Sequence, residues 1–138
     1  MKTPPILCGP GEKMVNKKIL IVDDNKSYLE ELKEVLEAEG FDAIPMVDSF
    51  EAYAVIYNIL PDLILLDLRM DGMNGFQLAS RIKETKRTSN IPIFAMSAFF
   101  DAEQHPGLIR RCGIQEYFTK PYDVEQIISK IRDTLEIN

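Results

Sequence analysis

The fold is decided by one stretch of the sequence, Lys18-Ile19-Leu20-Ile21-Val22-Asp23-Asp24-Asn25. Its apolar run is short and continuous, which is typical of a strand buried on both faces of a parallel sheet. An acidic pair follows directly, where the strand is expected to end. A strand of this kind needs helices on both faces of its sheet, so strands and helices should alternate along the rest of the chain.

Four further apolar runs predict strands, at Phe41–Met46, Leu63–Leu66, Ile91–Met96 and Tyr117–Thr119. Helical spacing of apolar residues separates them. We expect the first helix to stop at Gly40 and the second to begin at Asp48 or Ser49 and end before Pro61. The apolar positions that predict the helices after the first are Phe50, Ala54 and Tyr57, then Phe76, Ala79 and Ile82, then Val124, Ile127, Ile128, Ile131 and Leu135.

The segment Phe99–Gly113 should hold the fourth helix, but it contains Pro106-Gly107, so this helix is expected to be short, late or broken. Five strand–helix repeats with buried strands imply right-handed crossovers and a doubly wound α/β fold. The 138 residues suffice for one domain. We assign it to residues 17–138 and interpret the Pro/Gly-rich residues 1–16 as a disordered or extended tail.

The composition argues against several classes of partner and metal site. The formal net charge of -6 and a pI near 4.8 argue against direct binding to nucleic acid. No apolar stretch approaches the roughly 18 residues that cross a membrane, so no membrane association is expected. Cys8 and Cys112 lie far apart, which favours neither a disulfide nor a zinc site and predicts a reducing, cytoplasmic location.

Polar residues follow the predicted strands in a pattern that suggests a site. They are Asp23 and Asp24 after the first strand, Asp67 after the third, Ser97 after the fourth and Lys120 after the fifth. Any one of them could be an ordinary turn former or helix cap. Ligands of open α/β sheets, however, bind beyond the carboxyl ends of the strands, where all five would meet.

Three carboxylates in one crevice need a positive partner. Like charges about 4 Å apart repel by roughly 4 kcal/mol at an effective dielectric near 20, and a single lysine does not neutralise three acids. Oxygen ligands without His or Cys favour Mg²⁺ or a similar hard cation. A carboxylate nucleophile, a metal, a lysine and a hydroxyl together suit phosphoryl transfer, although this chemistry alone leaves several phosphotransfer enzymes possible.

Four motifs in order resemble the receiver domains of two-component response regulators. They are Ile19–Asn25, Asp67–Gly75, Met96-Ser97-Ala98 and Tyr117-Phe118-Thr119-Lys120-Pro121, and the resemblance covers residues 17–137. It implies a flavodoxin-like, doubly wound (βα)5 fold with a five-stranded parallel sheet in the order 2-1-3-4-5. It also implies a phosphorylation-dependent switch that resets by autodephosphorylation, rather than a turnover enzyme.

The resemblance implies a role for each site residue. Asp67 is the phosphoacceptor, and Lys120 contacts the phosphoryl oxygens from a peptide bond to Pro121 that should be cis. Mg²⁺ is held by Asp67, by Asp24 directly, by Asp23 largely through water and by the backbone carbonyl of Arg69. Ser97 moves toward the phosphoryl group, and Tyr117 turns inward as the coupled switch residue.

The same resemblance implies the partners. The phosphoryl donor is a sensor histidine kinase or a histidine phosphotransfer protein. Because the sequence stops after the last predicted helix, we expect the output to be protein–protein binding to an effector that the sequence does not identify. The chain is expected to be a monomer or a weak dimer through the fourth helix, fifth strand and fifth helix.

Three residues depart from the pattern or invite another interpretation. Asp71 stands where the family usually has proline, as a fourth acid near the site or as part of an Asp71-Gly72 turn facing solvent. Pro106 falls within the expected partner-binding helix. His105, the single histidine, is expected to be an exposed surface residue, since phosphohistidine carriers are helical bundles.

Two other functions fit the sequence less well than the switch does. A module that keeps the fold without phosphorylation would have no need of Asp23, Asp24, Asp67, Ser97 and Lys120, all of which are present. An aspartate-nucleophile phosphatase would have two acids separated by one residue on the first strand. The run Asp23-Asp24-Asn25-Lys26 lacks that spacing.

Overall fold

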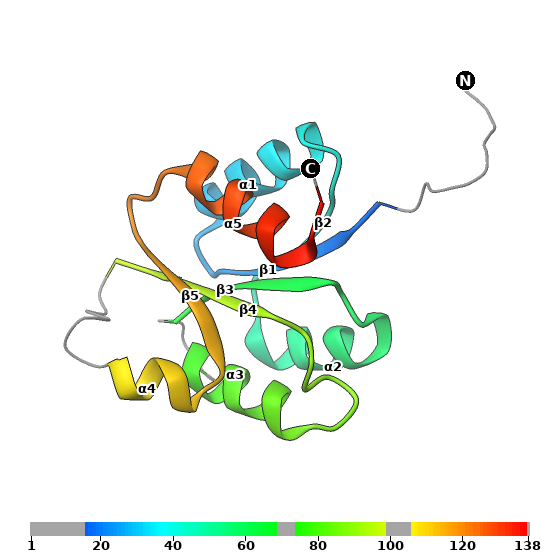
Figure 1. Cartoon of the computed structure of the whole chain (residues 1–138), viewed down its shortest axis with the longest axis vertical. Coiled ribbons are helices and arrows are strands. Elements are labelled where there is room, and N and C mark those ends of the chain that lie inside the picture. The colour runs from blue at the N-terminus through cyan, green and yellow to red at the C-terminus, as the bar shows by residue number, and fades with distance from the viewer. Residues whose placement is uncertain (1–15, 69–73, 99–105, 138) are drawn as a thin grey trace.

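The computed structural model describes residues 16–68, 74–98 and 106–137. Strands and helices alternate along this part of the chain (Figure 1). In order they are β1 (Lys18–Val22), α1 (Lys26–Ala38), β2 (Asp42–Met46), α2 (Ser49–Ile59), β3 (Leu63–Asp67), α3 (Gly75–Glu84), β4 (Ile93–Ser97), α4 (Pro106–Arg111), β5 (Ile114–Thr119) and α5 (Val124–Leu135).

The strands form one parallel sheet in the order β2-β1-β3-β4-β5, which confirms the predicted doubly wound fold. Helices α1 and α5 cover one face of the sheet, and α2, α3 and α4 cover the other (Figure 1). The strand order reverses direction at β1 and β3, so the crevice between their carboxyl ends is the place where a ligand would bind.

The core lies in two layers, one on each side of the sheet. Ile19 and Ile21 pack toward α1 and α5, whereas Leu20 and Val22 pack toward the opposite helices. All four side chains are fully buried, each contributing about 2 kcal/mol of hydrophobic stabilisation. This two-sided burial explains why β1 is a continuous apolar run rather than an alternating one.

The helix ends follow the sequence signals. Asn25 caps α1 by accepting hydrogen bonds from the backbone N–H groups of Ser27 and Tyr28, and Asp48 caps α2 in the same way. Helix α1 is followed by Gly40 at a φ of 95°, a left-handed conformation that favours glycine. Helix α4 spans Pro106–Arg111 and directly follows a stretch, residues 99–105, that lies outside the described part of the chain.

Helix α2 presents a different face to the core from the one suggested by its apolar spacing. The positions Phe50, Ala54 and Tyr57 lie on the exposed side, and the Phe50 residue is 60% exposed. The buried residues are Ser49, Ala52 and Ile56. The predicted apolar face of α2 was therefore wrong, because this helix carries apolar residues on both sides.

Strand boundaries differ slightly from the predicted ones. Strand β4 begins at Ile93, after Pro92, and β5 begins at Ile114, three residues before the predicted start. Among the described residues, no helix is long and apolar enough to cross a membrane.

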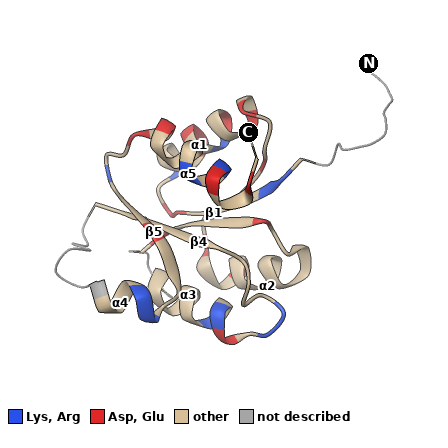
Figure 2. Cartoon of the chain, in the orientation of Figure 1, with Lys and Arg blue, Asp and Glu red and all other residues tan. Residues whose placement is uncertain are grey.

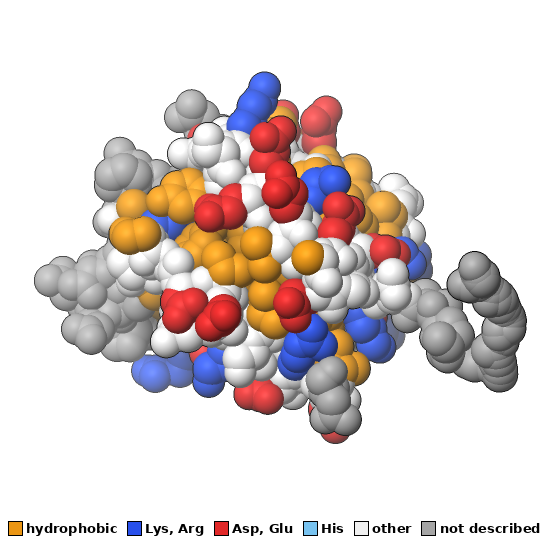
Figure 3. Space-filling model, turned by 90° about the horizontal axis from the view of Figure 1, so that it is seen from above, with side chains coloured by type: hydrophobic (Ala, Val, Ile, Leu, Met, Phe, Trp, Pro, Cys, Tyr) orange, Lys and Arg blue, Asp and Glu red, His pale blue; other side chains and the backbone are white. Residues whose placement is uncertain are grey.

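Charge is distributed unevenly between the two helical layers (Figure 2). Basic residues at the end of α3 and on α4 include Arg81, Lys83, Arg110 and Arg111. The opposite layer is rich in acids, and a view over α1 and α5 shows apolar side chains between acidic ones (Figure 3).

Candidate functional site

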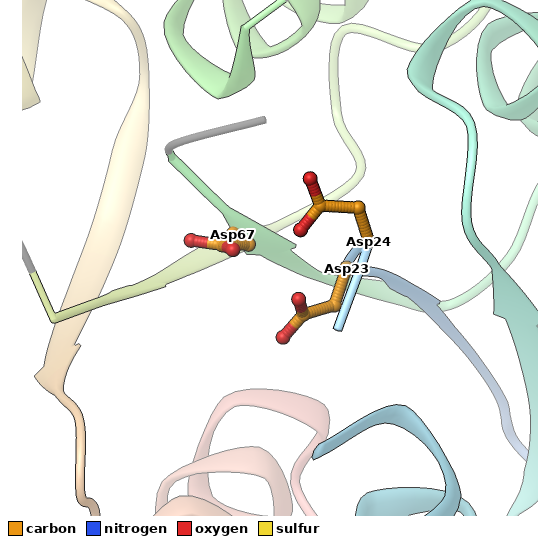
Figure 4. A group of neighbouring side chains, drawn as sticks. All are labelled: Asp23, Asp24 and Asp67. Atoms are coloured by element: carbon orange, nitrogen blue, oxygen red, sulfur yellow. The ribbon is translucent and has the colours of Figure 1, made fainter. Parts of the chain in front are cut away.

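Three carboxylates meet at the carboxyl ends of the two central strands. Asp67 is the last residue of β3, and Asp23 and Asp24 directly follow β1, its hydrogen-bonded neighbour in the sheet. One oxygen from each carboxylate lies within 4.8 Å of the other two. Figure 4 shows the three side chains beside one another at these strand ends. The structure thus brings together the three acids that the sequence predicted to meet.

The Lys120 ammonium lies against two of these acids. Its Nζ is 2.7 Å from Oδ2 of Asp23 and 3.6 Å from Oδ2 of Asp67, and the lysine side chain is only 6% exposed. The backbone N–H of Lys120 donates to the Ser97 carbonyl, which fixes the lysine beside the end of β4. The Lys120–Pro121 peptide bond is cis, as predicted.

The acids differ in their surroundings. Asp23 is fully buried, and its second oxygen, Oδ1, accepts a hydrogen bond from the backbone N–H of Asn25 at 2.9 Å. Asp67 is buried, whereas Asp24 is exposed and opens the cluster to solvent. With all three ionised, the acids and one lysine leave an excess of negative charge. An all-oxygen cluster with this imbalance fits a hard divalent cation such as Mg²⁺.

Ser97 and Tyr117 occupy adjacent strands next to this cluster. Ser97 ends β4 and is fully buried. Tyr117 lies on β5, is half-buried, and its hydroxyl donates to the Ser97 backbone carbonyl at 3.4 Å. The two residues predicted to act as a coupled switch are therefore in direct contact.

Comparison with known proteins assigns the chain to a family. The sequence profile of the response regulator receiver domain matches residues 19–132. This chain belongs to the response regulator receiver domain family. It is a phosphorylation-dependent switch of two-component signalling, as receiver domains are.

Curated relatives of this receiver domain are about twice its length. It is 35% identical over 123 residues to the phosphate regulon transcriptional regulatory protein PhoB of Pseudomonas aeruginosa, covering 88% of this chain and 53% of that protein. It is 32% identical over 119 residues to the DNA-binding dual master transcriptional regulator RpaA of a Synechocystis strain, covering 86% and 48%. The chain thus spans about half the length of the curated relatives it matches.

Solved structures agree with the fold. A putative response regulator from Chloroflexus aurantiacus superimposes with a TM-score of 0.81 at 26% identity, covering 88% of this receiver domain and 99% of that chain. A CheY-like receiver domain protein from Methanospirillum hungatei gives a TM-score of 0.81 at 25% identity, covering 88% and 95%.

Some predicted positions of the receiver domain lie outside the described residues. They include Arg69, whose backbone carbonyl was predicted to hold the metal, and also Asp71 and His105.

Three residues that shape the site were not predicted from the sequence. Gly75 begins α3, where a Cβ would lie 2.5 Å from the Asp67 carbonyl oxygen, so only glycine lets α3 approach β3 this closely. The Lys120 Nζ lies 4.1 Å from the centre of the Tyr28 ring. The Tyr28 ring packs on Tyr122, with 5.6 Å between centroids. Gly75 lies within the Asp67–Gly75 motif, but nothing in the sequence indicates the aromatic contacts.

The Tyr122 hydroxyl has an unusual environment. It is buried and has no hydrogen-bond partner within the described part of the chain. Burial, followed by the nearby charge of Asp23, raises the pKa of the Tyr122 hydroxyl well above its usual value. The hydroxyl therefore stays protonated at neutral pH beside the acidic cluster.

Proposed function

We propose that this receiver domain accepts a phosphoryl group on Asp67 from a sensor histidine kinase or a histidine phosphotransfer protein. The observation that carries the proposal is the position of the Asp67 carboxylate. An Asp67 oxygen lies within 4.8 Å of an oxygen of each of two other acids, and another contact places Asp67 3.6 Å from the Lys120 ammonium. A bound cation and the lysine could therefore both contact the oxygens of a phosphoryl group on Asp67. Its strand-end location also leaves it at the edge where α/β proteins bind ligands.

Mg²⁺ fits the donor set that the site offers. Asp24 and Asp67 would hold it directly and Asp23 largely through water, with the backbone carbonyl of Arg69, outside the described residues, completing the protein's share. Bound there, Mg²⁺ would neutralise charge on the acids and on the phosphoryl oxygens. The burial of Asp23, and its bonds to Lys120 and the Asn25 N–H, suit an indirect role for this carboxylate.

The transfer itself requires one carboxylate and one donor imidazole. An Asp67 oxygen attacks phosphorus, the bond from phosphorus to the histidine nitrogen breaks, and the imidazole takes the electron pair and a proton. The product is a mixed anhydride of Asp67 and phosphate. Lys120, already 3.6 Å from Asp67, donates to a phosphoryl oxygen and offsets its developing charge.

Ser97 and Tyr117 carry the signal away from Asp67. The phosphoryl group brings additional negative charge and three strong acceptor oxygens into a buried site. The Ser97 hydroxyl moves toward one of these oxygens and donates to it. Tyr117, which touches the Ser97 carbonyl in the structure, turns inward into the space that opens beside it.

The switch resets by hydrolysis. Water attacks phosphorus, the bond to the Asp67 oxygen breaks, and the products are inorganic phosphate and the free carboxylate. The domain returns to its first state after one signalling event, so it is a phosphoacceptor with intrinsic autodephosphorylation rather than a turnover enzyme.

The output is proposed to be protein–protein binding to an effector, by a monomer or by a weak dimer that forms through α4, β5 and α5. Two of the relatives are named as DNA-binding regulators, and this chain spans about half the length of each. The formal net charge of -6 does not favour direct contact with nucleic acid. The domain is taken to extend from residue 17, just before β1.

The phosphoacceptor proposal is tested by intact mass. The wild-type chain is incubated with Mg²⁺ and a small acyl phosphate, and the gain of one phosphoryl group is followed over time. We expect the wild type to gain it, Asp67→Asn not to gain it, and chelation of Mg²⁺ to abolish the gain.

The control is Asp133→Asn, which removes an exposed carboxylate on α5 far from the cluster in sequence. This variant should be phosphorylated as fast as the wild type. Equal phosphorylation of the Asp67→Asn variant, or none in the wild type, would show that Asp67 is not the acceptor.

A further inference from the structure

Lys120 is held by an aromatic ring as well as by acids. Its Nζ lies 4.1 Å from the centroid of the Tyr28 ring, which is within the range of a cation–π interaction. The same nitrogen is 2.7 Å from Asp23 and 3.6 Å from Asp67. The ammonium thus has the two acids and the ring as neighbours, and its side chain is only 6% exposed.

The Tyr28 ring is itself fixed in place. Tyr28 lies in the first turn of α1, where its backbone N–H donates to the Asn25 side chain that caps the helix. Its ring packs on Tyr122 at a tilt of 51°, and Tyr122 follows the cis Lys120–Pro121 bond directly. The platform under the lysine is therefore built from both sides of the site, one ring from α1 and one from the loop after β5.

An aromatic ring can restrain the Lys120 side chain in a way that an ion pair alone does not. A lysine side chain has a flexible four-carbon stem and gains several rotamers when it is released into water. Asp23 holds the ammonium on one side, but an ion pair alone does not exclude water. An aromatic face attracts the cation and occupies the space that water would otherwise fill.

We propose that Tyr28 is a positioning residue that holds the Lys120 ammonium over the crevice between Asp23 and Asp67, ready for the incoming phosphoryl group. This inference rests on the proposed role of Lys120 in phosphoryl transfer. In this scheme Tyr28 does not contact the phosphoryl group. It acts through the lysine, by keeping the ammonium in place before the reaction begins.

The alternative is that Tyr28 only fills space against Tyr122. Two substitutions separate these roles. Tyr28→Phe keeps the ring and removes a hydroxyl for which the structure gives no hydrogen bond within the described residues. Tyr28→Leu keeps apolar bulk but removes the aromatic face. The matched control is Tyr57→Leu, the same chemical change at an exposed tyrosine on α2.

The first measurement needs no phosphorylation. The ε-methylene group of Lys120 is observed by NMR in the full chain with selectively labelled lysine, assigned by comparison with Lys120→Met. We expect ring-current-shifted resonances in the wild type, in Tyr28→Phe and in Tyr57→Leu. They should move to the values of an ordinary lysine in Tyr28→Leu. Unshifted resonances in the wild type, or the same shift in Tyr28→Leu, would overturn the proposal.

The second measurement is phosphorylation by a small acyl phosphate with Mg²⁺, followed as a function of donor concentration. Loss of one partly buried cation–π contact corresponds to about a three- to tenfold change in rate. We expect Tyr28→Leu to lower the limiting rate by this factor with little change in half-saturating donor concentration. Tyr28→Phe and Tyr57→Leu should match the wild type.

The outcomes distinguish the two proposals. A wild type that is never phosphorylated refutes the role of Asp67, while the NMR experiment still decides where the lysine lies. Normal phosphorylation of both Tyr28 variants refutes the positioning role and leaves Asp67 intact. If Tyr28→Phe is as slow as Tyr28→Leu, the hydroxyl rather than the ring is responsible, and the proposal is wrong.

Discussion

Replacing Asp67 by Asn should stabilise the metal-free protein, although the replacement removes the proposed phosphoacceptor. Asp67 lies within 4.8 Å of two other carboxylates, so each pair repels by at least about 3.5 kcal/mol at an effective dielectric near 20. Its attraction to the Lys120 ammonium at 3.6 Å amounts to about 4.6 kcal/mol on the same scale. The two repulsions together exceed the attraction to Lys120 by about 2 kcal/mol.

Two further effects modify this figure. Asp24 is exposed, so solvent weakens its share of the repulsion. The Asp67 residue is only 6% exposed, so ionisation there also carries a desolvation cost that Asn removes. We therefore expect Asp67→Asn to raise the free energy of unfolding by about 1 to 2 kcal/mol in the absence of metal.

The assay is urea unfolding in chelator and in saturating Mg²⁺. Magnesium should stabilise the wild type more than Asp67→Asn, because the variant has lost one ligand, so the advantage of the variant should shrink or reverse. Asp133→Asn, on the exposed side of α5, should change stability by less than about 0.5 kcal/mol in either buffer. If Asp67→Asn instead lost about 1 kcal/mol or more in chelator, lysine pairing would outweigh acid repulsion and the reasoning would fail.

Three other predictions follow from the same structure. Gly75→Ala should cost about 2 kcal/mol or more in urea unfolding and slow phosphorylation, since its Cβ would lie 2.5 Å from the Asp67 carbonyl oxygen; a neutral effect would contradict this close approach. Tyr122→Phe should be neutral or stabilising by up to about 1 kcal/mol at pH 7. Burial raises the pKa of Tyr122 in the folded protein above its unfolded value near 10. The free energy of unfolding of the wild type should therefore fall as the pH rises beyond about 10, and that of Tyr122→Phe should fall less steeply. Urea unfolding at several alkaline pH values tests this, and parallel curves for the two proteins would refute it. Phe50→Gln should change the unfolding free energy by less than about 0.5 kcal/mol, whereas Ile56→Ala should cost about 3 kcal/mol, and the reverse order would mean that α2 packs through its other face.

The fold was predictable because continuous apolar runs in the sequence indicate strands that are buried on both faces. The run Lys18–Val22 is apolar on both faces, and the structure shows why: alternate side chains enter separate core layers. Strand β3 is also a continuous apolar run up to Asp67, and it is buried along its whole length. Once several such strands alternate with helices, the handedness of the crossovers leaves few topologies, and the observed order β2-β1-β3-β4-β5 is one of them.

The face of α2 was not predictable from spacing alone. Phe50, Ala54 and Tyr57 recur at helical intervals, but so do Ala52 and Ile56, which are the buried ones. The helix is apolar around most of its circumference, so periodicity does not select one side. The choice comes from tertiary packing, which places Ile56 over the sheet and leaves the Phe50 residue 60% exposed.

The functional site, like the fold, was only partly predictable from the sequence. Asp23, Asp24 and Asp67 could be placed together because parallel strands end at one edge of a sheet, and that rule needs only the position of each strand end. The contact between Lys120 and Tyr28 follows no such rule. It depends on the direction of a long side chain and on a ring that enters from the first turn of α1, and neither is encoded in local sequence.

The balance of charge explains why a site of this composition acts as a switch. The acids hold buried negative charge that one lysine only partly offsets, so the cluster is poised to respond when the charge changes. Phosphorylation replaces one carboxylate charge by about two and adds three acceptor oxygens, each of which requires a donor. Lys120, which contacts Asp23 and the Tyr28 ring, is the proposed donor to one of them. The proposed donor to the second is Ser97, which is buried at the end of the neighbouring strand β4 and whose backbone carbonyl accepts from the Tyr117 hydroxyl. In the proposed switch, the need to satisfy new acceptors in a buried site is what couples Asp67 to β5.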